Sequence, residues 1–242
     1  MTESLQGRIA AVTGGTRGIG RAIAERLLRE GAAVAFCGRT QESADRAAAE
    51  MRSLGRVFAM AADVSRAEQV RAFFDAIDRE FGRLDILVNN AGGAVFKKVA
   101  DLSPEDWQFN LELNLNGSFY CCHEALPRFR RSGGGFVVNI SSLAGKNAFS
   151  GGAAYNAAKA GLNLFTEAMM LDHRQENVRV CSIMPGSVDT HFSGNPGKPR
   201  SGNTNWMIAP EDVAETVALV LKMPSRTMIS AVEMRPSKPQ KS

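Results

Sequence analysis

The sequence has few cysteines and histidines, no long apolar run and little excess charge, and these shortages exclude several classes of protein. Its four cysteines and three histidines form no C-x-x-C pair and no cluster with zinc spacing, so we expect free buried thiols and no metal site. A formal net charge of +4 without a long basic run argues against a nucleic-acid or anionic-membrane partner. No apolar run reaches the roughly 18 residues of a membrane-spanning helix. The first eight residues show no secretory signal, so we expect a cytoplasmic protein.

Short apolar segments alternate along the 242 residues with longer segments of helical period. The segments that we predict to be strands are Ile9–Val12, Ala33–Cys37, Val57–Ala61, Ile86–Val88, Phe136–Ile140, Val178–Met184 and Met228–Met234. The segments that we predict to be helices are Gly18–Glu30, Gln41–Leu54, Ala67–Phe81, Pro104–Arg131, Ala153–Gln175 and Pro210–Lys222. Apolar strands without polar alternation are typical of parallel sheets covered on both faces. The pattern therefore predicts one doubly wound α/β domain over residues 1–242, with a substrate loop at 193–205 and a flexible tail at 236–242.

A glycine-rich segment, Thr13–Gly20, follows the first predicted strand and opens the first predicted helix. Its glycines permit a tight turn and let the backbone approach a pyrophosphate, while the helix amino terminus offers unpaired N–H groups and a partial positive charge. The spacing is G-x-x-x-G-x-G rather than G-x-G-x-x-G. Its place between a strand and a helix predicts a site for the phosphates of a dinucleotide.

The end of the second predicted strand indicates which dinucleotide binds. NAD-selective sites place Asp or Glu there to bond the adenosine ribose, whereas this chain has Gly38 followed by Arg39. A carboxylate would repel a 2′-phosphate, and a guanidinium binds one with paired hydrogen bonds. Arg17, in the glycine-rich segment, is placed to reach the same phosphate. We therefore predict NADP(H); the alternatives are NAD and a pair of merely solvated arginines.

Three residues in the second half of the chain predict acid–base chemistry. Tyr155 and Lys159 stand four residues apart on a predicted helix and so share one face. An ammonium near a phenol favours the phenolate and lowers the phenol pKa from about 10 toward the range useful for proton transfer. Ser142 precedes Tyr155 by 13 residues and follows a strand end, where parallel sheets bind ligands. A hydrolytic Ser142 is disfavoured because there is no G-x-S-x-G elbow and no histidine in these motifs.

Seven short motifs stand in one order along nearly the whole chain. They are Thr13-Gly14-x-x-x-Gly18-Ile19-Gly20, Asp63-Val64, Asn89-Asn90-Ala91-Gly92, Asn114-x-x-Gly117, Ser141-Ser142, Tyr155-x-x-x-Lys159 and Pro185-Gly186-x-Val188-x-Thr190. Through them the chain resembles the short-chain dehydrogenase/reductase family, including its 3-oxoacyl-[acyl-carrier-protein] reductase-like members. The resemblance implies a Rossmann-type fold, with a seven-stranded parallel sheet flanked by helices.

The resemblance also implies catalytic roles for Asn114, Ser142, Tyr155 and Lys159. Tyr155 would pass a proton to the carbonyl oxygen as hydride arrives from the nicotinamide, and Lys159 would lower the Tyr155 pKa and bond the nicotinamide ribose. Ser142 would hydrogen-bond the substrate oxygen, and Asn114 would hold a water for proton supply. The family's interval before the tyrosine favours Ser142 over its neighbour Ser141, and Asn114 is favoured over Asn116.

The glycine-rich segment, the two arginines and the resemblance together indicate the cofactor-binding residues. They are Gly14, Thr16, Arg17, Gly18, Ile19, Gly20, Arg39, Thr40, Asp63, Val64, Asn90, Ala91, Gly92, Tyr155, Lys159, Pro185, Gly186, Val188 and Thr190. By resemblance, Asp63 and Val64 contact adenine, residues 90–92 line the adenosine ribose side and brace the sheet centre, and residues 185–190 grip the carboxamide.

Three features bear on substrate and partners. An apolar wall near the loop 193–205 is offered by Phe96, Phe149, Met184, His191, Phe192, Trp206 and Met207. Acyl-carrier reductases of the family dock their carrier with basic residues; here Arg130, Arg131 and Arg174 are nearby, but Gly133 and Glu176 stand at the matching positions. The segment 228–236 lacks the paired glycines found near the carboxyl end of many members. Apolar faces on helices 104–131 and 153–175 predict a homo-oligomer, a dimer or a tetramer.

We therefore predict an NADP(H)-dependent oxidoreductase that transfers hydride between the nicotinamide and a small carbonyl or secondary-alcohol substrate. NADP preference favours the direction of reduction. Two alternatives remain open. One is a catalytically silent dinucleotide-binding regulator, which would need the pocket but not the acid–base group; the other is an NAD-dependent alcohol dehydrogenase.

Overall fold

The computed structural model describes residues 3–190, 192 and 204–239, in which seven strands form a single sheet. The strands are β1 (Ile9–Thr13), β2 (Ala33–Gly38), β3 (Val57–Ala61), β4 (Ile86–Asn89), β5 (Gly135–Ile140), β6 (Val178–Pro185) and β7 (Ala231–Met234). Their order is β3-β2-β1-β4-β5-β6-β7, and every neighbouring pair is parallel. The predicted Rossmann-type, doubly wound sheet is confirmed.

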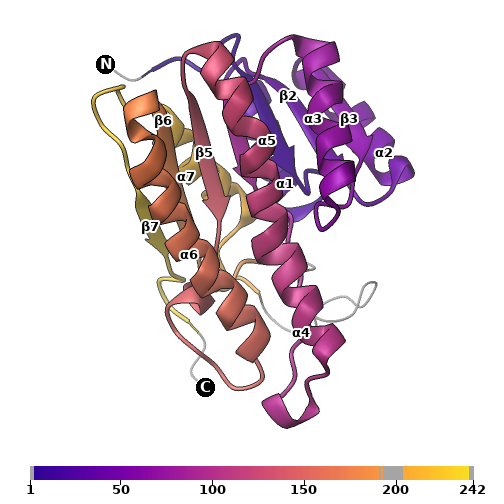
Figure 1. Cartoon of the computed structure of the whole chain (residues 1–242), viewed down its shortest axis with the longest axis vertical. Coiled ribbons are helices and arrows are strands. Elements are labelled where there is room, and N and C mark those ends of the chain that lie inside the picture. Colours follow the sequence, from indigo (N-terminus) through magenta and orange to yellow (C-terminus); the bar gives the residue numbers. More distant parts are fainter. Residues whose placement is uncertain (1–2, 191, 193–203, 240–242) are drawn as a thin grey trace.

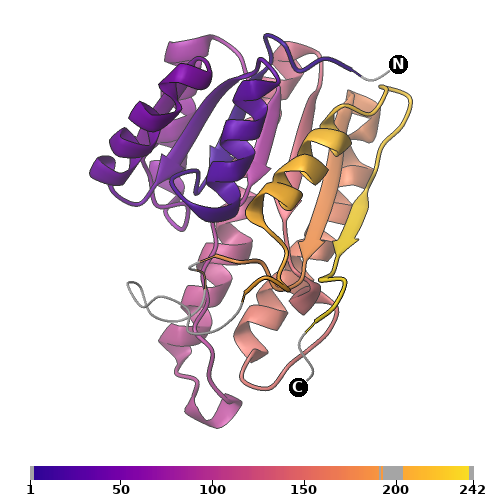
Figure 2. The ribbon, with the colours of Figure 1, turned by 180° about the vertical axis from the view of Figure 1, so that it is seen from behind.

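Helices cover both faces of this sheet. They are α1 (Gly18–Arg29), α2 (Gln41–Met51), α3 (Ala67–Phe81), α4 (Pro104–Leu111), α5 (Gly117–Ser132), α6 (Ala153–His173) and α7 (Pro210–Leu221). In Figure 1, α3, α5 and α6 lie in front of the strands; Figure 2, from behind, shows α1 and α7 on the opposite face. Two apolar cores result, because successive strand residues point to opposite faces. In β1, for example, Ala10 and Val12 pack with α1 and α7, while Ile9 and Ala11 pack toward α3 and α5.

The predicted helix Pro104–Arg131 is interrupted by a π-helical turn, Glu112–Asn116, between α4 and α5. The side-chain amide of Asn114 donates to the carbonyl of Asn110 at 2.9 Å. A side-chain donor inside the backbone ladder is a known cause of such a local widening. The turn therefore lies at a residue that the sequence assigned to the active site.

The last strand is shorter than predicted, because β7 begins at Ala231 and not at Met228. The N–H of Val180 on β6 donates to the thioether sulfur of Met228 at 3.3 Å rather than to a backbone carbonyl. A side chain thus replaces the ladder hydrogen bond that a longer β7 would make there. Pairing of β6 with β7 accordingly runs from Ser182 to Pro185.

All four cysteines are free and buried, as expected from their apolar neighbours. Burial raises the pKa of each thiol, to about 11 for Cys37 and about 12 for Cys122 and Cys181, because thiolates lose solvation. In the described part of the chain, no helix combines the length and apolarity needed to cross a membrane. Within the same residues, no group of three or more His, Cys, Asp or Glu side chains is placed to hold a metal ion.

Candidate active site

The glycine-rich segment connects β1 to α1 at the carboxyl edge of the sheet. Gly14 and Gly18 have φ angles of +68° and +55°, in the left-handed region that favours glycine. A Cβ atom added to Gly20 would collide with the carbonyl oxygen of Gly14 and the side-chain amide of Asn90. The three glycines are therefore required by the backbone itself, and α1 begins with its amino terminus at this turn.

Asn90 and Thr13 fasten the glycine-rich segment to the end of β4. The Asn90 amide donates to the carbonyl oxygens of Thr13 and Gly14 at 3.0 and 3.2 Å. In return, the Thr13 hydroxyl accepts the backbone N–H groups of Asn90 and Ala91, both at 3.0 Å. Sequence reasoning placed Asn90 here but assigned no role to Thr13. Its hydroxyl, one residue before the first glycine, was the signal that it holds this turn.

The end of β2 lies against the glycine-rich segment. The Gly15 N–H donates to the Cys37 carbonyl at 3.0 Å, and a Cβ on Gly38 would collide with the Thr16 side chain. A carboxylate at position 38 is therefore excluded by packing as well as by charge. Arg17 and Arg39 flank this contact and are exposed, and their side chains make no hydrogen bond or ion pair to any described residue.

The predicted phosphate side is completed by the start of α2. Thr40 is the N-cap of this helix, and its hydroxyl accepts the backbone N–H of Ser43 at 3.3 Å. Arg39 directly precedes this cap, so its charge adds to the positive end of the helix dipole. Ile19, by contrast, packs against the apolar core on the α1 face.

Asp63 and Val64 form a fixed turn after β3. One carboxylate oxygen of Asp63 accepts the N–H and the hydroxyl of Ser65 at 3.0 and 2.7 Å, and the Asp63 N–H donates to Gln69. Val64 is buried against Gly117, where an added Cβ would come within 2.9 Å of its methyl group. Hydrogen bonds fix the position of Asp63, and packing fixes that of Val64. The second carboxylate oxygen of Asp63 takes no part in the hydrogen bonds to Ser65.

The segment Pro185–Thr190 crosses from β6 toward the glycine-rich segment. The Gly186 N–H donates to the Met234 carbonyl at 2.8 Å, and Val188 forms a parallel bridge with Ile208. At the far end, a Cβ on Gly18 would lie 3.3 Å from the Thr190 methyl group. These two segments therefore face each other at the carboxyl edge of the sheet.

Tyr155 and Lys159 lie near the start of α6, and both are buried, at 8% and 4% exposure. The Lys159 Nζ lies 5.8 Å from the centre of the Tyr155 ring and donates to the Ile140 carbonyl at 3.0 Å. The structure thus brings this predicted pair together, one helical turn apart, beside the end of β5.

Ser142 and Ser141 point in different directions after β5. The Ser142 hydroxyl lies beside the Tyr155 phenol and lowers its pKa. It donates to the Pro185 carbonyl at 3.5 Å and accepts the Ala144 N–H at 3.1 Å. The Ser141 hydroxyl is buried and donates to the backbone carbonyl of Lys159 at 3.4 Å. Of the two serines, Ser142 is the one that contacts the phenol.

Asn114 is fully buried in the π-helical turn. Its amide donates to the carbonyl oxygens of Gly93 and Asn110 at 2.7 and 2.9 Å, and its oxygen accepts the Gly93 N–H at 3.3 Å. A Cβ on Gly92 would lie 2.9 Å from the Asn114 oxygen and 3.9 Å from Lys159 Nζ. Asn114 and Lys159 therefore both lie next to Gly92, where the space between them is too small for a side chain.

Burial controls the acidity of the Tyr155–Lys159 pair. Loss of solvation raises the pKa of Tyr155 to about 12, and the Ser142 hydrogen bond offsets this only in part. The same effect lowers the pKa of Lys159 to about 8. Desolvation of the phenolate is therefore the main influence on the Tyr155 pKa in this arrangement, and the Lys159 ammonium donates to the Ile140 carbonyl. That Lys159 lowers the Tyr155 pKa stays a prediction.

Aromatic rings surround Tyr155. Phe96 and Phe192 each lie 5.7 Å from it between ring centres, and Phe149 lies 5.6 Å from Phe96. Of the other residues predicted to form an apolar wall, Met184 is buried in β6, and Trp206 and Met207 are half-buried. His191, residues 193–203 of the predicted substrate loop, and residues 240–242 of the tail lie outside the described residues.

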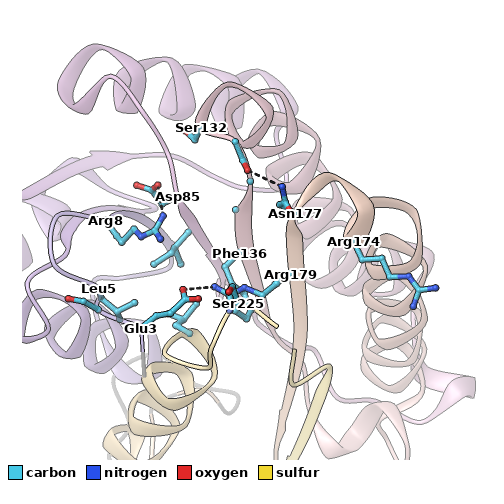
Figure 3. Close-up of a pocket in the computed structure, with 16 residues that line it drawn as sticks. Glu3, Leu5, Arg8, Asp85, Ser132, Phe136, Arg174, Asn177, Arg179 and Ser225 are labelled. Carbon is cyan, nitrogen blue, oxygen red and sulfur yellow. Dashed lines mark hydrogen bonds and ion pairs between the residues drawn. The ribbon is translucent and has the colours of Figure 1, made fainter. Parts of the chain in front are cut away.

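A cavity of about 320 Å³ opens at the opposite edge of the sheet, near the amino ends of β1, β4, β5 and β6 (Figure 3). Four of its charged groups form two ion pairs, Arg8 with Asp85 at 3.3 Å and Arg179 with Glu3 at 3.1 Å. None of the residues that the sequence assigned to the site lines this cavity. The cavity is therefore separate from the candidate active site.

Comparison with known proteins identifies the family of the chain. The family model described as short chain dehydrogenase matches residues 8–200, and the chain belongs to that family. An uncharacterized oxidoreductase of Staphylococcus aureus strain MW2 is 32% identical over 234 residues, which span 96% of this chain and 98% of the relative.

Solved structures of similar proteins superpose over almost the whole chain. An alcohol dehydrogenase from the archaeon Thermococcus sibiricus, complexed with 5-hydroxy-NADP, has a TM-score of 0.89 at 30% identity and covers 98% of this chain and 100% of that one. A metagenomic short-chain oxidoreductase in complex with NADP has a TM-score of 0.84 at 33% identity, with the same coverage. A 3-ketoacyl-ACP reductase from Sinorhizobium meliloti has a TM-score of 0.86 at 31% identity and covers 94% of this chain and 97% of that one. The chain is thus an oxidoreductase of the short-chain dehydrogenase type.

Proposed function

We propose that this oxidoreductase uses NADP(H) and interconverts a carbonyl compound and a secondary alcohol, with Tyr155 exchanging the proton at the substrate oxygen. One observation carries the proposal: Asn114, Ser142, Tyr155 and Lys159 gather at the carboxyl edge of the sheet, on the same edge as the glycine-rich segment. Ligands of doubly wound sheets bind at this edge. A catalytically silent regulator would have no need of that acid–base group.

The residues fit an adenosine 2′-phosphate. Gly20 packs tightly against Gly14 and Asn90, and Gly38 packs against Thr16, so side chains at these two positions would disrupt the turn that would hold the phosphates. Arg17 and Arg39 carry charges that no described residue neutralises, and α2 directs its positive end to the same place. Two of the similar structures are described as complexes with NADP or a derivative of it. When bound, the nicotinamide supplies or accepts the hydride.

The acidity of Tyr155 supports reduction as the favoured direction. Because burial raises its pKa to about 12, Tyr155 is a neutral phenol near pH 7 and can donate a proton to a developing alkoxide. Ser142 donates a second hydrogen bond at that oxygen. Lys159, whose pKa is lowered to about 8, stays mainly protonated near neutral pH and can return a proton toward Tyr155. Asn114 holds the backbone around this ammonium.

We also propose that the protein is a homo-oligomer, a dimer or a tetramer. Apolar side chains are exposed on α4, α5 and α6, namely Trp107, Phe119, Leu164 and Leu171. Pairing of these helices between two copies would remove that surface from water. A mass of two or four chains by light scattering at micromolar concentration is expected, and a monomer would overturn this part of the proposal.

The experiment that tests the function is consumption of NADPH with a panel of ketones and aldehydes. We expect turnover with NADPH, and at least about tenfold lower kcat/KM with NADH, because NADH lacks the phosphate that Arg17 and Arg39 would bind. Tight NADPH binding without turnover of any carbonyl compound would favour the regulator. Equal use of NADH would favour an NAD-dependent alcohol dehydrogenase.

A further inference from the structure

We propose that the substrate of this reaction is an aryl carbonyl compound, in which an uncharged aromatic ring is attached to the carbon that is reduced. The inference rests on the proposed function. It concerns the three phenylalanines around Tyr155, which we call the aromatic cluster: Phe96, Phe149 and Phe192. They come from three separate segments, after β4, before α6 and after β6.

The aromatic cluster is built directly on the phenol that would donate the proton. Phe96 meets the Tyr155 ring at 86° and Phe192 meets it at 55°, each with ring centres 5.7 Å apart. Phe149 extends the cluster from Phe96 at 65°. An aromatic ring of the substrate could pack against these rings in the same edge-to-face or tilted way, because ring edges are positive and ring faces are negative. A ring attached to the reacting carbon would lie within reach of these contacts.

The cluster is also incompletely covered by the described residues. Phe96, Phe149 and Phe192 are 39%, 46% and 37% exposed, whereas Tyr155 is buried. Three large apolar side chains gathered at one exposed place are typical of a ligand site. Burial of this surface by a substrate is favourable, because it removes apolar area from water.

Most of the positive charge close in sequence to the cluster is already paired. Lys97 pairs with Asp106 and Lys146 with Glu233, each at 2.5 Å, whereas Lys98 is exposed and makes no ion pair with a described residue. A carboxylate on the substrate would compete with Asp106 and Glu233 for the paired lysines.

Charge also argues against an acidic acyl carrier. Of the three basic residues near the docking place expected from the family, Arg130 pairs with Glu176 at 2.8 Å and Arg131 pairs with Asp78 at 3.0 Å. The third, Arg174, is exposed and makes no ion pair with a described residue. Binding a carrier there would require both ion pairs to break. The aromatic cluster therefore favours a small uncharged ketone over an acyl thioester.

The carbonyl carbon gains a hydride from NADPH, the C=O π bond breaks, and the oxygen gains the proton of Tyr155. An aryl carbinol and NADP⁺ are formed, and the phenolate recovers its proton from solvent through Lys159.

The test is a set of matched ketones: acetophenone, cyclohexyl methyl ketone, 2-butanone and an acetoacetyl thioester. We expect kcat/KM for acetophenone to exceed that for cyclohexyl methyl ketone by about tenfold. The two rings have the same number of carbon atoms, and conjugation makes the aryl ketone intrinsically harder to reduce, so such a preference comes from the protein. Equal or better use of the cyclohexyl ketone or the thioester would overturn the substrate class and leave the proposed function standing.

Variants connect the preference to the cluster. Phe96→Leu and Phe192→Leu should each lower the aryl-to-cyclohexyl ratio of kcat/KM by about threefold or more, because leucine keeps apolar bulk but lacks a ring. Phe81→Leu, on α3, is the matched control and should leave the ratio unchanged. Cluster variants that lower both rates equally would show a merely structural role and overturn the inference. If no ketone is reduced at all, the proposed function itself fails.

Discussion

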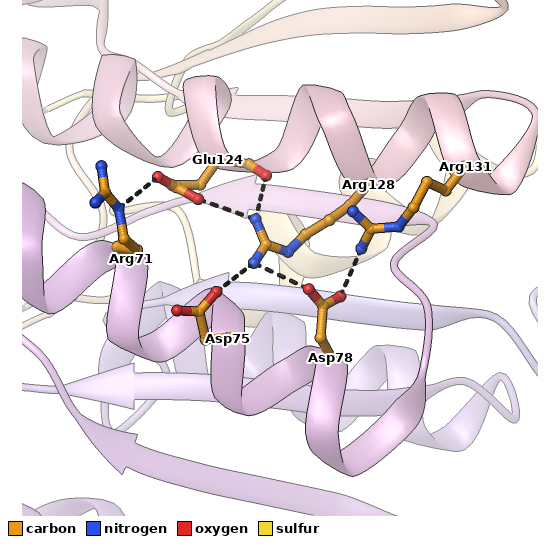
Figure 4. Close-up of polar contacts among 6 residues, drawn as sticks. All are labelled: Arg71, Asp75, Asp78, Glu124, Arg128 and Arg131. Atoms are coloured by element: carbon orange, nitrogen blue, oxygen red, sulfur yellow. Dashed lines mark hydrogen bonds and ion pairs between the residues drawn. The ribbon is translucent and has the colours of Figure 1, made fainter.

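Two buried cations, Arg128 on α5 and Lys159 on α6, differ in whether carboxylates lie close enough to pair with them. Both are almost fully buried, at 5% and 4% exposure. The Arg128 guanidinium pairs with Asp75, Asp78 and Glu124 at 2.9 to 3.0 Å (Figure 4). Among the described residues Lys159 has no carboxylate partner and donates to a backbone carbonyl.

The difference matches two roles, a structural one for Arg128 and a proton-exchanging one for Lys159. Three carboxylates compensate the desolvation of Arg128 and hold α5 against α3, and Arg71 and Arg131 extend the network at its edge (Figure 4). Lys159 is left uncompensated, so its pKa falls to about 8. A group that must exchange protons needs a pKa near the working pH. The free-energy cost of burying such a cation without a carboxylate partner is offset by stabilising contacts elsewhere in the fold.

Loss of Arg128 should give the largest effect on stability. Arg128→Ala leaves three carboxylates facing one another in a half-buried place, and we expect the free energy of unfolding to fall by about 3–5 kcal/mol. Urea or thermal unfolding measures this. Arg131→Ala is the matched control: the Arg131 side chain is 58% exposed, so its loss should cost about 1 kcal/mol or less. Equal decreases in the free energy of unfolding in the two variants would show that the buried ion pairs of Arg128 do not stabilise the packing of α5 on α3.

Replacement of Lys159 should stabilise the folded protein, whereas replacement of Arg128 should destabilise it. The pKa of Lys159 is lowered by burial from 10.5 to about 8, so between these values the unfolded chain holds a proton that the folded chain has released. The contribution of Lys159 to the free energy of unfolding therefore rises with pH across this window. Lys159→Met should be more stable than the parent protein at pH 7, by up to about 3 kcal/mol, with the gain shrinking above pH 8. Its turnover should nevertheless fall.

Unfolding of the two proteins at a series of pH values tests this. A gain that does not change with pH would show that the titration of Lys159 is not linked to folding. A loss of stability at pH 7 would show that the ammonium is compensated after all.

A smaller effect is expected from Arg39, a cation at the surface. Arg39→Asp should move the NADP/NAD ratio of kcat/KM toward NAD by about tenfold or more, because the carboxylate accepts ribose hydroxyls and repels the 2′-phosphate. Arg46→Asp on α2 is exposed and makes the same change of charge, so it should leave the ratio nearly unchanged. An equal shift in both variants would indicate a general field effect rather than a specific contact.

The sequence predicted the fold well because its signals are local. The apolar runs and the helical period located the strands and the long helices of the described residues, with errors at their ends and at the π-helical turn that divides 104–131. The short 3-10 helices Val99–Asp101 and Leu143–Gly145 were not predicted. The glycine-rich segment, the Tyr155–Lys159 spacing and Ser142 were also predictable, since each depends on a few neighbouring residues or on the family resemblance. The start of β7 was not, because it depends on Met228, whose sulfur reaches across to β6.

The features that were missed depend on contacts between distant segments. In the sequence, Arg128 is part of a basic run with Arg130 and Arg131, and only the packing of α5 on α3 shows that it points inward. The direction of the Tyr155 pKa shift follows from burial, which spacing does not reveal. A buried neutral row, Asn89 to Asn139 to Thr166 with hydrogen bonds of 2.8 Å, also joins β4, β5 and α6 beneath the site. It shows that α6 is held by polar contacts as well as by apolar packing.

The central claim is that Tyr155 supplies the proton in an NADPH-dependent reduction, and the chain offers a matched control because it has two tyrosines. The measurement is kcat for NADPH oxidation with a ketone that the parent protein reduces, compared between Tyr155→Phe and Tyr120→Phe. Tyr155→Phe should lower kcat by at least about a hundredfold, because it removes the proton donor and keeps the ring. Tyr120→Phe should leave kcat within about twofold. Undiminished turnover in Tyr155→Phe would contradict the account.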